Sequence, residues 1–273
     1  MTTFANRTQL RYVELPFKFT LFIYRIKWLP TMCQLLGMNC NTPTDIVFSF
    51  EGFRCRGGLT DVHGDGWGIA FFEGDGCRLF LDYLPSSQSP VADLVRSYPI
   101  KSRNVIAHIR KATQGTINLA NTHPFQRELW GRYWIFAHNG NLLDLPPLGE
   151  ARFQVVGSTD SEHAFCWLLN QLATQFVQQP TRSVLRLAVK ELAQQLASHG
   201  TCNFLLSNGE TLFAHCSTAL HYVVRQAPFT TAHLSDMDMA VDFSNETTPN
   251  DKVALIATQP LTYNENWIAM QSG

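Results

Sequence analysis

The chain has 273 residues, of which 45% are hydrophobic and 16% charged, and its formal net charge is −1. This composition is typical of a globular enzyme, and the lack of a broad basic field predicts no nucleic-acid or membrane partner. The seven cysteines are odd in number and form no Cys-x-x-Cys pair. They predict free thiols in the reducing cytoplasm, and we find no metal-ligand spacing.

Residues 1–31 differ from the rest of the chain. Residues 17–29 are apolar but interrupted by Lys18, Arg25 and Lys27, so they are too short and too charged for a membrane-spanning helix. A small-residue cleavage site is also missing, which argues against a secretory signal. A start assigned too early, a cleaved leader and a true extension all remain open. We favour the first, and expect residues 1–31 to be a leader or mis-assigned start, followed by one functional domain over residues 33–273.

Apolar periodicity predicts strands and helices along the rest of the chain. The expected strands are residues 34–38, 67–72, 77–83, 104–109, 133–137, 202–207, 211–216, 220–224 and 253–257. The expected helices start at Thr42-Pro43 and at Ser89-Pro90, where proline suits the first helical position, and span residues 159–172 and 184–196. Strand groups that alternate with helix pairs suit a layered α+β domain.

The dipeptide Met32-Cys33 is the most informative local feature. A cysteine at the first position of a mature chain carries a thiol and a free α-amine on the same carbon. The ordinary pKa of the amine is about 7.7–8.0 and that of the thiol about 8.5, so the amine can take the thiol proton directly or through a water. Cys33 is therefore a candidate nucleophile, although a single cysteine is more often a small core residue.

Three downstream segments supply the other groups that acyl transfer needs. Asn139 offers a side-chain amide, and Gly140 lets a backbone N–H approach an oxyanion. Arg110 suits a substrate carboxylate, and Asp160 suits an ammonium. Each has a simpler interpretation. Arg110 alone is more often a surface or packing arginine, Asn139-Gly140 is also a hairpin-turn signal, and Asp160 is also a helix first-turn acid.

The order of these motifs resembles the class II glutamine amidotransferases, which are N-terminal-nucleophile hydrolases. The motifs are Cys33, His63-Gly64-Asp65-Gly66-Trp67-Gly68, His108-Ile109-Arg110, His123-Pro124, His138-Asn139-Gly140-Asn141 and Thr159-Asp160-Ser161-Glu162. The resemblance is strongest to small stand-alone bacterial members of the YafJ type. It implies a four-layer αββα sandwich, Cys33 as nucleophile, and an oxyanion hole formed by Asn139 and Gly140. It also implies that Arg110 and Asp160 hold the α-carboxylate and α-amine of glutamine, with Thr113 lining the pocket.

We therefore expect a cytoplasmic amidohydrolase that needs no cofactor or metal and cleaves the γ-amide of glutamine or of a γ-glutamyl compound. Lys111 and Gln114 stand where other members have Trp and His, so the identity of the acyl donor stays open. The ammonia would pass to a separate protein, or the enzyme would simply hydrolyse its substrate. The rival hypothesis is a non-catalytic, glutamine-binding regulatory subunit.

Overall fold

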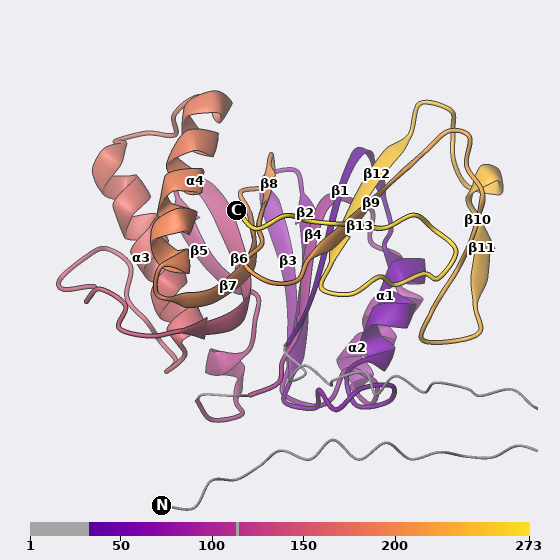
Figure 1. The fold of residues 1–273 in the computed structure, drawn as a ribbon, viewed down its shortest axis with the longest axis horizontal. Coiled ribbons are helices and arrows are strands. Elements are labelled where there is room, and N and C mark those ends of the chain that lie inside the picture. The colour runs from indigo at the N-terminus through magenta and orange to yellow at the C-terminus, as the bar shows by residue number, and fades with distance from the viewer. Residues whose placement is uncertain (1–32, 113–114) are drawn as a thin grey trace, which may run out of the picture. The chain divides into compact units, whose positions relative to one another are not determined.

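The structure is a computed structural model that describes residues 33–112 and 115–273 (Figure 1). The predictions made for residues 1–31 and for Thr113 lie outside the described residues.

The larger sheet has seven strands in the order β13-β9-β12-β1-β4-β2-β3, and its neighbouring strands are antiparallel. The strands are β1 (Gln34–Thr44), β2 (Trp67–Glu73), β3 (Gly76–Asp82), β4 (Ser102–Ile109), β9 (His221–Gln226), β12 (Lys252–Ala257) and β13 (Ile268–Ala269). The register pairs both Gln34 and Trp67 with Ile109. The start of β1, the end of β4 and the start of β2 therefore meet at one edge of the sheet.

The second sheet has four strands in the order β5-β6-β7-β8, all antiparallel. They are β5 (Phe125–Leu129), β6 (Arg132–Leu142), β7 (Gly200–Ser207) and β8 (Leu212–His215). A separate two-stranded ribbon joins β10 (Thr231–His233) and β11 (Ala240–Asp242), and single 3₁₀ turns span Leu119–Asn121 and Phe243–Asn245.

Four helices cover the outer faces of the two sheets. They are α1 (Val47–Cys55), α2 (Pro90–Ser97), α3 (Asp160–Gln175) and α4 (Arg182–Ala197). Ser89 caps α2 by accepting the Ala92 N–H, and Thr159 caps α3 by accepting the Glu162 N–H. Each hydroxyl satisfies one of the N–H groups that a helix start leaves without an internal partner.

Figure 1 shows the two sheets side by side, with a helix pair outside each. Three apolar clusters hold these layers together. One packs α1 and α2 on the larger sheet around Phe50 and Trp67, and another packs α3 and α4 on the second sheet around Phe136 and Phe165. The third lies between the two sheets and contains Leu35, Ile106, Ala137 and Leu205. Alternate residues of β6 point to opposite faces, so Phe136 reaches the helices and Ala137 the facing sheet. The predicted four-layer αββα sandwich is confirmed.

One local prediction and one alternative interpretation are wrong. The helix expected from Thr42-Pro43 starts only at Val47, because β1 continues to Thr44; the Val47 N–H donates to Asp45 Oδ1 over 3.1 Å. Asn139 and Gly140 do not form a hairpin turn. They lie inside β6, opposite Asn203 and Cys202 of β7. The short strands β5, β10, β11 and β13 were not predicted.

Two further observations concern the cysteines and the helices. All seven cysteines are free thiols. Within residues 33–112 and 115–273, no helix is both long enough and apolar enough to cross a bilayer.

Candidate active site

Cys33 lies directly before β1, and Lys111, two residues after the end of β4, lies beside it. The Lys111 N–H donates to the Cys33 thiol over 3.2 Å, and the thiol donates to the Lys111 carbonyl over 3.3 Å. Burial raises the pKa of the Cys33 thiol; the Lys111 backbone and the charge of Arg110 oppose this, and Asp160 adds to it. The thiol therefore holds its proton near neutral pH and needs a base before it can attack.

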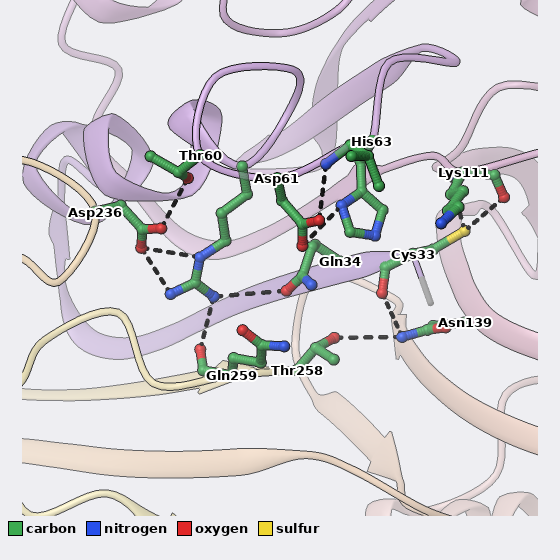
Figure 2. A network of polar contacts seen from close by, with 12 residues as sticks. Cys33, Gln34, Thr60, Asp61, His63, Lys111, Asn139, Asp236, Thr258 and Gln259 are labelled. Atoms are coloured by element: carbon green, nitrogen blue, oxygen red, sulfur yellow. Dashed lines mark hydrogen bonds and ion pairs between the residues drawn. The ribbon is translucent and has the colours of Figure 1, made fainter. Parts of the chain in front are cut away.

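Asn139 reaches Cys33 from the opposite sheet. Its Nδ2 donates to the Cys33 carbonyl and, over 3.4 Å, to Thr258 Oγ1, as Figure 2 shows. Both oxygens face the same end of the amide, so they fix which end carries the N–H groups. Asn203 holds the backbone behind it by donating to the Asn139 carbonyl over 3.0 Å.

Gly140 is required by the packing of β6 against β7. A Cβ built on it would lie 1.8 Å from the Thr201 carbonyl oxygen and 2.6 Å from His138 Nε2. Those separations are far below van der Waals contact, and the first is to backbone, which cannot move aside easily. A side chain at this position would push the strand that carries Asn139 away from β7.

A glycine-rich loop clamps the chain around Arg110. The Arg110 N–H donates to the Gly66 carbonyl over 2.8 Å, the Asp65 N–H donates to the Arg110 carbonyl over 3.2 Å, and Asp65 Oδ2 accepts the Ala112 N–H over 2.7 Å. Gly66 has a φ of 106°, a backbone conformation that favours glycine. This explains the His63–Gly68 motif, which positions the segment carrying Arg110 and the Lys111 backbone.

The Arg110 side chain is almost fully buried. Its guanidinium donates to the Thr116 carbonyl over 3.2 Å and to the Gly115 carbonyl over 3.3 Å. Arg110 therefore anchors the loop that follows it as well as placing a positive charge close enough to affect the Cys33 thiol.

Asp160 is the first residue of α3, and its Oδ2 accepts the Leu142 N–H over 2.8 Å. This bond places the carboxylate beside the end of β6, two residues after Gly140. A recess of about 300 Å³, lined in part by Leu142, Val155 and His163, opens beside it. His138 stiffens this region, because its Nδ1 contacts Ser161 Oγ at 2.8 Å and its Nε2 contacts the Thr201 carbonyl at 3.2 Å.

Five of the six predicted site residues thus lie in one region. Cys33 and Asn139 are joined by a hydrogen bond, Gly140 follows Asn139, and the charges of Arg110 and Asp160 both affect the Cys33 pKa. Thr113, the sixth, lies outside the described residues. Sequence reasoning did not single out Asn203 or Thr258, and it named Asp65 only as part of the His63–Gly68 motif. For Thr258 a signal was present: it is a polar residue directly after a buried strand, as Arg110 is.

A family profile described as class-II glutamine amidotransferases matches residues 32–273. The chain belongs to this family. It is 57% identical over 251 residues to a Haemophilus influenzae protein assigned as a glutamine amidotransferase, covering 92% of this chain and 85% of that one. It is 53% identical to YafJ of Escherichia coli, which carries the same assignment, covering 89% of this chain and 95% of YafJ.

Comparison with a solved structure agrees with this family membership. The crystal structure of a predicted glutamine amidotransferase from Pseudomonas aeruginosa superposes with a TM-score of 0.70 at 46% identity, covering 88% of this chain and 94% of that chain. A shorter similarity, 31% identity over 119 residues, links it to the γ-glutamyl-hercynylcysteine sulfoxide hydrolase of Mycobacterium tuberculosis, covering 41% of this chain and 46% of that protein.

Two buried histidines lie close to the Arg110 segment. The rings of His108 and His123 have centroids 4.2 Å apart, and none of their four nitrogens has a hydrogen-bond partner among the described residues. Burial lowers the pKa of both imidazoles well below the ordinary value, and the positive charge of Arg110 contributes in the same direction. Both rings are therefore neutral in the folded protein at neutral pH.

This pair makes the fold sensitive to acid. The folded pKa of each histidine lies below its unfolded value of about 6.5, so as the pH falls below 6.5 the unfolded chain binds protons that the folded chain does not. The free energy of unfolding should then fall by up to about 2.7 kcal/mol per pH unit while both groups titrate. Urea unfolding at pH 7.5, 6.5 and 5.5 measures this slope, and the double variant His108→Gln/His123→Gln should make it less steep. His199→Gln, in the turn after α4, is the control and should leave the slope unchanged. An equally steep slope in the double variant would contradict the assignment.

Proposed function

We propose that this chain is a cytoplasmic amidohydrolase that cleaves the γ-amide of glutamine or of a γ-glutamyl compound, with Cys33 as nucleophile. The single observation that carries the proposal is the hydrogen bond from the Asn139 amide to the Cys33 carbonyl. It joins the candidate oxyanion donor, which lies in the second sheet, to the candidate nucleophile, which precedes a strand of the larger sheet. Family membership supports the same assignment of roles.

The proposed reaction proceeds in two acyl-transfer steps. The Cys33 sulfur attacks the γ-carbonyl carbon after its proton passes to the α-amine, and the oxyanion that forms is stabilised by Asn139 Nδ2 and the Gly140 N–H. The C–N bond then breaks, and the proton leaves with the amine or ammonia. Water attacks the thioester, the α-amine accepts its proton, and the C–S bond breaks to give glutamate and the free thiol.

The α-amine is the proposed base for a physical reason. The Cys33 pKa is raised by burial, so the thiol does not ionise on its own. The hydrogen bonds that the described residues make to its sulfur come from the Lys111 backbone, which supplies no base. A free amine requires a chain that begins at Cys33, so we propose that residues 33–273 form the mature amidotransferase domain and that residues 1–32 are absent from it.

Arg110, Asp160 and Thr113 are the proposed substrate-binding residues. Arg110 and Asp160 carry opposite charges, and both are close enough to affect the Cys33 thiol, which suits the carboxylate and ammonium of an amino acid. The partial similarity to a γ-glutamyl hydrolase favours simple hydrolysis over transfer of ammonia to a separate protein. An intact Cys33–Asn139 pair favours an enzyme over a regulatory subunit that only binds glutamine.

The nucleophile is tested by covalent labelling. The glutamine analogue diazo-oxo-norleucine should add to Cys33 and to none of the other six cysteines. Cys33 is half-buried and its carbonyl accepts from the Asn139 amide, whereas Cys202, which lies opposite Gly140, is fully buried. Peptide mass spectrometry locates the label. Cys33→Ala should lose turnover and keep its thermal midpoint within about 3 °C, whereas Cys77→Ala, a half-buried cysteine on β3, should remain active. Label on another cysteine would refute the assignment.

The base is tested by the state of the N-terminus. A chain expressed from Met32, from which the initiator is removed, should hydrolyse glutamine at least as fast as the 273-residue chain. The reason is that an amide nitrogen at Cys33 has no lone pair available to take the thiol proton. Intact mass establishes which residues remain. Normal turnover by a chain whose mass includes all of residues 1–32 would rule out the α-amine as base.

The separate roles of Arg110 and Asn139 predict different kinetic defects. Arg110→Lys keeps the charge but loses the guanidinium that can bind a carboxylate in a bidentate manner. KM for glutamine should therefore rise at least ~10-fold with a smaller change in kcat. Asn139→Ala removes a transition-state donor, so kcat should fall roughly 10²–10³-fold. Steady-state glutaminase assays measure both, with the exposed Arg152→Lys as control. An Asn139→Ala variant that changed only KM would require the two roles to be reassigned.

A further inference from the structure

Thr258 connects the candidate nucleophile to the candidate oxyanion donor. It follows directly after β12 and is 6% exposed. Its Oγ1 accepts the Leu35 N–H over 2.9 Å and the second Asn139 Nδ2–H over 3.4 Å, while its own N–H donates to the Leu35 carbonyl over 3.1 Å. One hydroxyl therefore contacts both β1, two residues after Cys33, and the amide of Asn139. Figure 2 shows the contact between Thr258 and Asn139.

The two N–H groups of the Asn139 amide are held unequally. One makes a short bond to the Cys33 carbonyl, whereas the other makes a long bond to Thr258. A separation of 3.4 Å lies at the weak end of the hydrogen-bond range, so the second N–H can turn to a stronger, charged acceptor at little cost. Thr258 Oγ1 keeps the Leu35 N–H when this happens, so no buried acceptor is left without a donor.

We propose that Thr258 is a positioning residue that holds the second Asn139 N–H before reaction and releases it to the oxyanion that forms on the substrate. This inference rests on the proposed function, and it assigns a role to a residue outside the motifs that identify the family. Thr258 acts through Asn139 and does not itself touch the substrate.

A buried arginine fixes the segment that carries Thr258. Arg56 donates to the carbonyls of Gln259 over 3.0 Å and Pro260 over 2.6 Å, and its Nε and Nη2 both donate to Asp236 Oδ2 at 2.9 and 2.8 Å. Its Nη1 also lies 3.5 Å from Oε1 of Gln34, the residue after Cys33. One guanidinium thus contacts both the residue after Cys33 and the two residues after Thr258, which keeps the Thr258 hydroxyl in register with Cys33.

Steady-state kinetics with γ-glutamyl-p-nitroanilide test the proposal. Thr258→Val keeps the side-chain shape but loses the acceptor, and should lower kcat about 10-fold or more with KM changed by less than about 2-fold. Thr258→Ser restores the hydroxyl and should return kcat to within about 3-fold of the parent. Because Thr258 acts through Asn139, adding Thr258→Val to Asn139→Ala should lower kcat by less than about 2-fold more.

A matched control separates positioning from stability. Ser102 is a buried hydroxyl at the start of β4 that accepts the Asn104 N–H over 3.2 Å and donates to the Phe72 carbonyl over 2.8 Å. Ser102→Ala should lower the thermal midpoint but leave kcat unchanged. Parent-like kcat in Thr258→Val, or equal fold losses with and without Asn139, would overturn this inference alone. Parent-like kcat in both Cys33→Ala and Asn139→Ala would overturn the proposed function as well.

Discussion

The hydrogen bond between the Asn139 amide and the Cys33 carbonyl joins the two sheets of the sandwich. Cys33 precedes the central β1 of the larger sheet, and Asn139 belongs to β6 of the facing one, so the bond exists only while the sheets keep their relative position. That position is set by the apolar layer between them, where Leu35 and Ala137 both lie. Interiors pack closely and do not slide freely, so the core that stabilises the fold also sets the geometry of the site.

Polar groups behind the site are buried in two different ways. The Arg56 guanidinium is compensated by Asp236 and by two backbone carbonyls, which offset its loss of water. His108 and His123 lack such partners among the described residues and stay neutral instead. The first arrangement holds a positive charge in place. The second keeps additional positive charge away from Arg110 at neutral pH.

The sequence was a good guide where a signal is local. The caps Ser89 and Thr159 mark α2 and α3 because a hydroxyl before a helix satisfies its first N–H groups. It was a poor guide where distant pairing overrides local preference. Asn139-Gly140 has the preferred sequence of a tight turn. However, β7 pairs with β6 continuously from Ile135 to Leu142, which holds the dipeptide in a strand. Pro43 suits a helix start, but β1 continues past it because Thr44 still pairs with Ser102 of β4.

The same distinction applies to the site. Cys33, Arg110, Asn139 and Asp160 were expected because each carries a group suited to the chemistry. The roles of Asp65 and Thr258 were not expected, because each residue acts by accepting a backbone N–H from a residue that is distant in sequence. Only the fold shows that the acceptor of the Leu35 N–H lies 223 residues further along the chain.

The absence of space at Gly140 has an evolutionary consequence. Since a Cβ there would strike the β7 backbone, selection for folding alone would retain this glycine in a descendant that had given up cleavage. The Cys33 sulfur is under no comparable restriction, because its partners are one backbone N–H and one carbonyl, and a serine hydroxyl can bond to both. In this lineage, then, the glycine would remain after the activity was lost, whereas the first cysteine would be free to change.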